Sequence, residues 1–168
     1  AGANYFYSNI PFVAPPAVSN LVTLGDDDIT ASLPIGFTFN YYGTNYTQFE
    51  ISSNGYMTFD LGTLLNGCCQ GQILPDPTPP NNLITGLWDD LYPPGAGTVG
   101  YQTFGTAPNR YLVVSWTGTP FCCGATPDVT SSIVLYETSN IIEIHTTNVS
   151  NASLATMGIE NVNGTLAT

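Results

Sequence analysis

The sequence LPIGFTFNYYGTNYTQFEISSNGYMTFD, from Leu33 to Asp60, contains the clearest strand pattern in the chain. Within it, Phe37, Phe39 and Tyr41 alternate with polar residues, a period of two that places one row of aromatic side chains on the buried face of a strand. The alternation resumes at Phe49 after a Tyr-Gly turn and continues after Ser-Asn-Gly. We therefore expect three consecutive antiparallel strands here.

The Ser-Asn-Gly turn sets the register of the second and third of these strands. A two-residue Asn-Gly loop would put the apolar residues of the two strands on opposite faces of the sheet. A three-residue loop with Gly55 in the left-handed conformation sets Ile51 opposite Met57 and Phe49 opposite Phe59. We predict the three-residue loop, because it buries all four apolar residues together.

Charge is the unusual feature of the composition. Of 168 residues, 43% are hydrophobic, which is ordinary, but only 8% are charged, against about 25% in typical soluble domains. Twelve carboxylates face one cation, Arg110, and the net charge is −11. Such a chain repels phosphate backbones and anionic lipid, which argues against nucleic-acid partners. No stretch approaches the ~20 apolar residues of a membrane span, so we expect no membrane insertion.

Residue usage indicates a secreted, extracellular β protein at the cell surface. Thr, Asn, Tyr and Gly are abundant, there are 13 prolines, and the good helix formers Lys, Arg, Glu and Gln are scarce. The chain opens Ala1-Gly2-Ala3 without methionine, as a mature product does after removal of a signal peptide.

The four cysteines support an oxidising compartment. They form two vicinal pairs, Cys68-Cys69 and Cys122-Cys123, each in a loop rich in Gly or Pro. Four cysteines allow three connectivities. Bonding within a vicinal pair closes a strained ring, so we predict two bridges between the loops. A four-thiolate metal site is the alternative, although zinc ligands usually have residues between them.

The rest of the chain reads as short strands separated by turns. This pattern predicts an all-β fold, an antiparallel β-sandwich of jelly-roll or immunoglobulin-like style, with long disulfide-stapled loops and little or no helix. No linker or internal repeat is found, so we expect a single domain over residues 1–168. Outside the central stretch, the predicted strands cover residues 21–24, 83–88, 98–104, 110–117, 131–137, 140–146 and 157–160.

Residues 1–20 are predicted to be an extended N-terminal segment. Its first half is strand-like, but its prolines confine it to a sheet edge or to an irregular entry. We interpret it as a candidate donor strand that pairs with another copy of the chain. The residues assigned to this assembly role are Asn4, Tyr5, Phe6, Tyr7, Ile10, Phe12 and Val13.

Six motifs in order carry a family resemblance: LPIGFTFNYYGTNY, ISSNGYMTF, NLITGLWDDLYP, GYQTFGTAPNRYLVVSW, IVLYETSNIIEIHTTN and ATMGIENVNGT. From about Leu24 to Thr165 the chain resembles a bacterial secreted β-sandwich module of the kind related to nidogen-type extracellular domains. Such modules occur beside subtilisin-like peptidases or in surface-anchored proteins, so the resemblance implies a non-catalytic structural, adhesive or accessory role. The cysteine pairs depart from the pattern. A further strand usually follows GIENVNGT, so we expect the sheet here to lack its final strand.

Two acidic clusters are the best candidates for ligand chemistry. Carboxylates crowded without cations repel one another, and calcium held by oxygens in an irregular loop relieves that repulsion. No EF-hand spacing is present, and a solvated acidic turn is the simpler alternative. We expect no required cofactor, with calcium as the candidate ion. The candidate ligands are Asp26, Asp27, Asp28, Asp89 and Asp90.

No motif for catalysis is present. The G-x-S-x-G elbow, H-E-x-x-H and phosphate-cradling loops are missing from the sequence. The single histidine, His145, is expected on the outward, exposed side of a strand, and Arg110 is expected to pair with a nearby carboxylate. A glycosidase needs only two facing carboxylates, and Asp89, Asp90, Glu137 or Glu160 could supply them, but nothing favours it. We expect that the protein is not an enzyme.

Aromatic residues and sequons raise the question of sugars. Tyr41, Tyr42, Tyr46, Tyr92 and Tyr101 lie near turns, where exposed rings could stack on a glycan, although core packing is the simpler expectation. The sequence also contains four Asn-x-Ser/Thr motifs, which make a glycoprotein if the host glycosylates them. The candidate acceptors are Asn45, Asn148, Asn151 and Asn163.

These observations favour a non-catalytic extracellular structural or adhesive protein. The hypothesis is a subunit of a cell-surface filament or sheath, a homopolymer assembled by β-strand addition through the N-terminal segment. The alternative is an accessory carbohydrate-binding module of a larger secreted enzyme, with a glycan as its partner.

Overall fold

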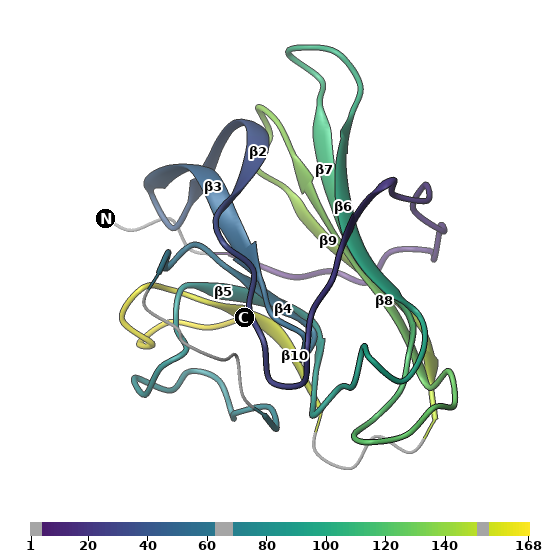
Figure 1. Cartoon of the computed structure of the whole chain (residues 1–168). Helices are drawn as coiled ribbons and strands as arrows, with labels where there is room; N and C mark the ends of the chain where they lie inside the picture. Colours follow the sequence, from purple (N-terminus) through teal and green to yellow (C-terminus); the bar gives the residue numbers. More distant parts are fainter. Residues whose placement is uncertain (1–4, 63–68, 151–154) are drawn as a thin grey trace.

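The computed structural model describes residues 5–62, 69–150 and 155–168. Two five-stranded antiparallel sheets pack as a sandwich, and the described residues contain no helix. The first sheet has the order β1-β6-β7-β8-β9 and the second the order β10-β5-β4-β3-β2 (Figure 1). The strands are β1 Asn20–Val22, β2 Leu33–Tyr41, β3 Thr44–Ile51, β4 Tyr56–Thr58, β5 Leu83–Trp88, β6 Thr98–Phe104, β7 Tyr111–Thr119, β8 Val129–Tyr136, β9 Ile142–Val149 and β10 Thr156–Glu160.

The all-β sandwich predicted from the sequence is confirmed, and so is the register of its central hairpin. Ile51 lies opposite Met57, and Gly55 has a φ of 87°, as the three-residue loop requires. The side chains of Phe49, Ile51, Met57 and Phe59 are all buried in the main core. The sequence pattern therefore determines which face of β3 and β4 points inward.

The two sheets are joined through their cores and at one corner. The buried Trp116 of β7 donates from Nε1 to the carbonyl oxygen of Ser52, directly after β3 of the other sheet, over 2.9 Å. At the corner, the Arg110 guanidinium donates to the Gly36 carbonyl of β2 and forms an ion pair with Glu137. The prediction that Arg110 pairs with a carboxylate is confirmed.

Within the described residues no strand follows β10, but a short return of the chain occupies part of its outer edge. Residues 166–168 turn back along β10 after the turn at 162–164. Ile159 and Thr168 exchange two backbone hydrogen bonds of 2.8 and 3.1 Å, and Asn161 donates to the Leu166 carbonyl. This short return covers the edge at its C-terminal half.

The N-terminal segment crosses the outer face of the first sheet (Figure 1). A row of paired residues runs across this face, from His145 in β9 through the small residues Ser132 and Ser115 to Gly100 in β6. The Phe12 ring lies 5.8 Å from the His145 ring, and a Cβ on Gly100 would lie 3.1 Å from Val18. We call residues 12–18 the strap.

The strap lies over this outer face, and residues beneath it are buried. His145 points outward as predicted, but it is only 6% exposed because Phe12 covers it, so the prediction of an exposed position was wrong. Ser115, Ser132, Val113 and Val134 share that face and are buried as well. Among the residues with a described placement, no helix is long and apolar enough to cross a membrane.

Two glycines at hairpin turns provide a test of the central hairpin. Gly55 and Gly43 both have positive φ, 87° and 86°, but only a Cβ on Gly55 would meet backbone, at 1.9 Å from the Leu87 carbonyl oxygen. We expect Gly55→Ala to lower the free energy of unfolding by more than about 3 kcal/mol, since strain and overpacking add. Gly43→Ala, with open space around it, should cost about 1–2 kcal/mol. Urea denaturation measures both, and equal losses would contradict the close packing at Gly55.

Candidate functional site

The acidic residues predicted to act together fall into two groups. Asp26 and Asp27, in the turn before β2, lie beside Asp90 in the loop after β5, and one carboxylate oxygen from each lies within 4.8 Å of the others. Asp28 is directed elsewhere, because its carboxylate accepts hydrogen bonds from the backbone of Gly25 and Ile29. Asp89 is buried, and its carboxylate accepts from the backbone NH of Asp90. We call Asp26, Asp27 and Asp90 the acidic cluster.

Asn54, in the Ser-Asn-Gly loop, holds the acidic cluster together. Its side chain is fully buried and donates from Nδ2 to Asp27 Oδ1 over 2.9 Å. Its Oδ1 accepts from the backbone NH of Leu91 over 2.8 Å, next to Asp90. One amide thus links three loops. No sequence signal marks this role, because Asn-Gly in a hairpin loop is explained by the turn alone.

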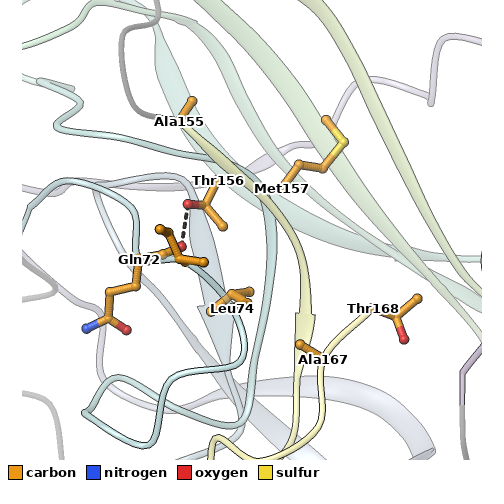
Figure 2. Close-up of a pocket in the computed structure, with 8 residues that line it drawn as sticks. Gln72, Leu74, Ala155, Thr156, Met157, Ala167 and Thr168 are labelled. Atoms are coloured by element: carbon orange, nitrogen blue, oxygen red, sulfur yellow. Dashed lines mark hydrogen bonds between the residues drawn. The ribbon is translucent and has the colours of Figure 1, made fainter.

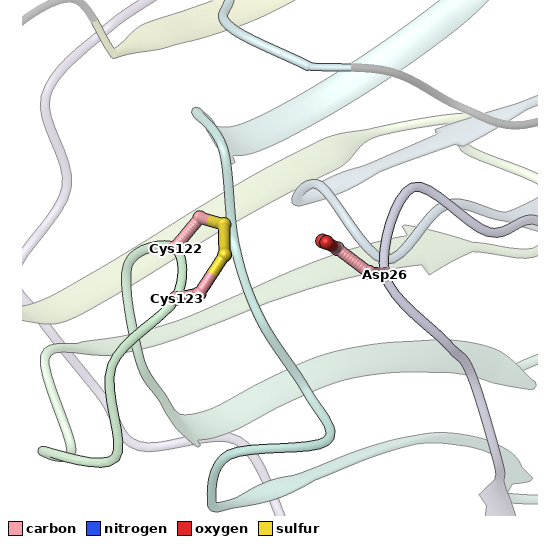
Figure 3. A group of neighbouring side chains, drawn as sticks. All are labelled: Asp26, Cys122 and Cys123. Carbon is pink, nitrogen blue, oxygen red and sulfur yellow. A yellow bond between two sulfur atoms is a disulfide. The ribbon is translucent and has the colours of Figure 1, made fainter.

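The cysteines lie at the same place but are not paired as predicted. Cys122 and Cys123 are bonded to each other, so the predicted bridges between the loops are wrong for these two residues. Residues of the acidic turn contact both cysteine loops, Asp27 on one side and Asp26 on the other. Cys69 is disulfide-bonded and its Sγ lies 3.4 Å from Asp27 Oδ2, whereas Asp26 extends toward the Cys122–Cys123 disulfide (Figure 3). Cys68 lies outside the described residues.

Electrostatics at the acidic cluster are unfavourable. Burial raises the pKa of the Asp90 carboxyl, and the negative charges of Asp27, Asp26 and Asp89 raise it further. The sole arginine is engaged with Glu137. Since like charges are held together without a cationic side chain in the cluster, a bound cation would relieve the repulsion.

The geometry of the cluster fits a hard divalent cation. Calcium binds oxygens at about 2.3–2.6 Å, so its ligands lie up to about 5 Å apart, and the three carboxylates meet that limit. Each carboxylate offers two oxygens, and irregular loops suit the flexible coordination of calcium better than the strict octahedron of magnesium. Asp26, Asp27 and Asp90 are the residues that would hold the ion; Asp28 and Asp89 are not in this arrangement.

A second site lies where the N-terminal segment meets the β2–β3 turn. The Tyr5 ring packs 4.9 Å from the Tyr42 ring and 5.7 Å from the Tyr41 ring. Its hydroxyl donates to the Asn40 carbonyl, and its own carbonyl accepts from Thr168 Oγ1. Burial raises the pKa of Tyr5 to about 12. We call the surface formed by Asn40, Tyr41, Tyr42 and Thr168 the tyrosine socket.

The residues between the socket and the strap are exposed. Phe6 is 91% and Tyr7 84% exposed, and Ile10 is also exposed. Phe12 and Val13 are exposed in part of their surface even though Phe12 covers His145. Among the assembly residues predicted from the sequence, only Asn4 lies outside the described part of the chain.

The pocket next to the socket contains no titratable group. It has a volume of about 340 Å³ and lies beside β10, where Thr156 Oγ1 donates to the Gln72 carbonyl (Figure 2). Thr168 belongs both to its wall and to the socket. Its lining offers no acid, base or nucleophilic thiol. The lining residues are Gln72, Ile73, Leu74, Ala155, Thr156, Met157, Ala167 and Thr168.

The remaining candidates are distributed over the surface and the core. Tyr41 is buried, and its hydroxyl donates to the Leu83 carbonyl, so it is not available for stacking on a sugar. The sequon residues Asn45, Asn148 and Asn163 are exposed, and Asn151 lies outside the described residues. Exposure keeps the three as candidate glycosylation sites.

The raised pKa of Asp90 predicts how stability depends on pH. A carboxyl whose pKa is higher in the fold than in the unfolded chain binds its proton more tightly when folded, so stability falls as pH rises from about 3.9 through the folded pKa. We expect Asp90→Asn to raise the melting temperature at pH 7 and to leave it unchanged in acid. Glu137→Gln is the control of opposite sign, because Arg110 lowers the pKa of Glu137. Calorimetry against pH measures both; a lower melting temperature for Asp90→Asn at pH 7 would refute the repulsion.

Calcium should stabilise the folded chain through the same carboxylates. Extracellular sites bind with Kd of about 10⁻⁴–10⁻³ M, so 10 Kd of calcium adds about 1.4 kcal/mol. We expect a rise in melting temperature with added calcium that Asp26→Asn abolishes and Asp76→Asn, outside the cluster, preserves. Equal responses of the two variants would show that the acidic cluster does not hold the ion.

Comparison with known proteins agrees with the resemblance drawn from the motifs. No curated protein and no solved structure matches the chain. A family model described as NIDO related matches residues 3–168. Domains of the nidogen type are typically extracellular. With a two-sheet sandwich and a match over nearly its whole length, the chain belongs to the NIDO-related family.

Proposed function

We propose that this protein is a non-catalytic structural subunit of an extracellular filament or sheath, in which the N-terminal segment of one copy adds to the sheet of the next. The observation that carries the proposal is the exposure of large apolar side chains on residues 6–13, a segment in no strand of the described chain. A partner that buries them removes a strong liability to nonspecific aggregation.

Charge favours contact between copies through this segment. Residues 1–25 contain no Asp, Glu, Lys, Arg or His, so the side-chain charge of −11 lies entirely in the rest of the chain. Two such bodies repel each other, least where neutral surfaces meet. Residues 6–13 of this neutral segment expose large apolar side chains on the surface of the molecule.

The outer edge of β9 is the acceptor that we propose. Within the described residues β9 pairs only with β8, and its other side has no strand partner. β1 has three residues, and residues 166–168 occupy part of β10. The edge of β2 is capped by side chains: Thr103 and Arg110 donate to the carbonyls of Ile35 and Gly36, Tyr5 donates to the Asn40 carbonyl, and Asn140 accepts from the Asn40 NH.

The segment already follows β9 in its own chain. Tyr5 is bound to Asn40, whose NH donates to Asn140, two residues before β9 begins. Phe12 lies against His145 in the middle of β9. After Phe12 the chain must reach β1 at the opposite edge of the sheet, about 19 Å away, with seven residues that span at most about 23–25 Å. Because these seven residues are nearly fully extended, the N-terminal segment cannot pair along the whole of β9 in its own chain. It is free to pair along β9 of a neighbouring copy.

Support for a non-catalytic role comes from the site chemistry. Neither the pocket beside β10 nor the apolar pocket between β1 and the loop after β5 has an ionisable lining residue. Of the carboxylates considered for a glycosidase, Glu137 is paired with Arg110 and Glu160 is fully buried. Carbohydrate binding is less favoured, because the most exposed aromatic rings among the described residues belong to the N-terminal segment.

The proposal predicts that residues 1–10 are needed for assembly and not for folding. A chain that starts at Pro11 keeps Phe12 on His145, so the strap remains in place. We expect it to stay monomeric under conditions in which the full chain forms filaments, as measured by electron microscopy and light scattering, with cooperative unfolding retained.

Substitutions test whether assembly depends on the apolar side chains of the N-terminal segment or only on its length. Phe6→Ser combined with Tyr7→Ser should prevent filaments as the truncation does. Val162→Ser, which removes an exposed apolar side chain elsewhere, should not. Filaments from the chain that starts at Pro11 would rule out assembly through the N-terminal segment.

A further inference from the structure

We infer that the tyrosine socket, which Asn40 links to Asn140 just before β9, anchors the donor segment and sets its register on the acceptor edge: in the filament the socket holds Tyr5 of a neighbouring copy, in exchange for its own. This inference rests on the proposed function and adds the site at which the donor segment is anchored. The occupant is a second copy of this chain, and the residue that it contributes is Tyr5.

The socket is built to recognise an extended segment with a tyrosine. It offers two aromatic faces, from Tyr41 and Tyr42, an acceptor for the phenol at the Asn40 carbonyl, and a donor to the backbone at Thr168. All four contacts are made to Tyr5 in its own chain. An identical segment from another copy can make the same contacts, which is the basis of domain exchange.

Tyr42 carries a conformational cost that turn formation alone does not explain. Tyr42 and Gly43 form the two-residue turn between β2 and β3, with φ values of 47° and 86°. Asn, Asp or Gly normally takes the first of these positions, because a bulky residue with positive φ is strained. At this position the ring is directed against Tyr5 and Tyr41. The strained backbone of Tyr42 thus lies in the tyrosine socket, and strain of this kind is common at binding surfaces.

The segment is weakly tied to its own body between the socket and the strap. Phe6 and Tyr7 are almost fully exposed, and Pro11 interrupts any continuous strand into the strap. Residues 5–11 can extend about 23 Å when released, enough to reach a neighbour while the strap keeps Phe12 on His145. When Tyr5 leaves its own socket, the contacts that it loses are made again in the socket of the neighbouring copy.

The gain from exchange lies in the exposed side chains. Aromatic residues bury about 150–250 Å² each, so Phe6, Tyr7 and Ile10 together bring several hundred Å² to a neighbour, comparable with the ~800 Å² that one partner contributes to a standard interface. The pocket that shares Thr168 with the socket has an uncharged lining that includes Leu74 and Met157. Apolar, uncharged surfaces on both sides avoid repulsion between acidic bodies.

Photocrosslinking with isotope-labelled chains tests the exchange. A small fraction of ¹⁵N-labelled chain, with a benzophenone amino acid in place of Tyr5, is polymerised with an excess of unlabelled wild-type chain. Mass spectrometry then identifies the crosslinked peptides. We expect crosslinks to residues 40–42 that join a heavy peptide to a light one in filaments, and heavy-to-heavy crosslinks in dilute monomer.

The outcomes separate the two proposals. Filaments with only heavy-to-heavy crosslinks would overturn the exchange at the socket and leave assembly itself intact. Absence of filaments from the wild-type chain under all conditions tried would overturn both. Crosslinks that join heavy and light peptides away from residues 40–42 would show a neighbour contact at another acceptor and would also overturn the socket.

A pair of variants tests the socket without altering the donor. Tyr42→Gly preserves the positive φ of the turn and removes the ring, so the fold is retained or stabilised, while the critical concentration for assembly should rise by about tenfold or more. Tyr42→Phe keeps the ring and should assemble like the wild type. Equal assembly of the wild type and Tyr42→Gly would contradict the inference.

Discussion

The buried amide of Asn54 is the contact on which the arrangement of the loops depends. It accepts from the Leu91 NH and donates to Asp27 at the same time, and it is fully enclosed. A buried amide that lost either partner would leave a polar atom unsatisfied, at a cost of about 1–3 kcal/mol. The loop after β5 and the turn before β2 are therefore held together by an uncharged side chain. The crowding of Asp26, Asp27 and Asp90 follows from this contact.

The same sandwich separates two kinds of surface. At the end that carries the acidic cluster, carboxylates and the Cys122–Cys123 disulfide gather in loops, and the chemistry suits a hard cation. At the β2–β3 turn, aromatic rings and an uncharged pocket surround the start of the chain. In the assembly that we propose, the neutral, apolar N-terminal segment is where two acidic bodies repel each other least. The proposed assembly therefore follows from the distribution of charge as much as from exposed hydrophobic area.

Because of the strap, a residue that faces outward from the first sheet can still be buried. Alternation along β9 placed Ile142 and Ile144 inward and His145 outward, and both Ile side chains do pack against the core. Alternation describes only the two faces of one strand; it contains no information on a segment 130 residues away in sequence that covers the outer face. Phe12 supplies that cover. Ser115 and Ser132, which lie between His145 and Gly100 on the same face, are buried as well.

The antiparallel sandwich, most strands, the Ile51–Met57 register and the pairing of Arg110 could be predicted from the amino-acid sequence, because period-two patterns and turn residues act locally. Three other contacts became visible only in the folded molecule: which aspartates meet, that Cys122 and Cys123 bond to each other, and that Tyr5 reaches Tyr42. Those contacts join loops and a terminal segment, whose paths depend on packing over the whole molecule and leave no periodic signal. The residues of both candidate sites could thus be named in part from the sequence, but their partners could not.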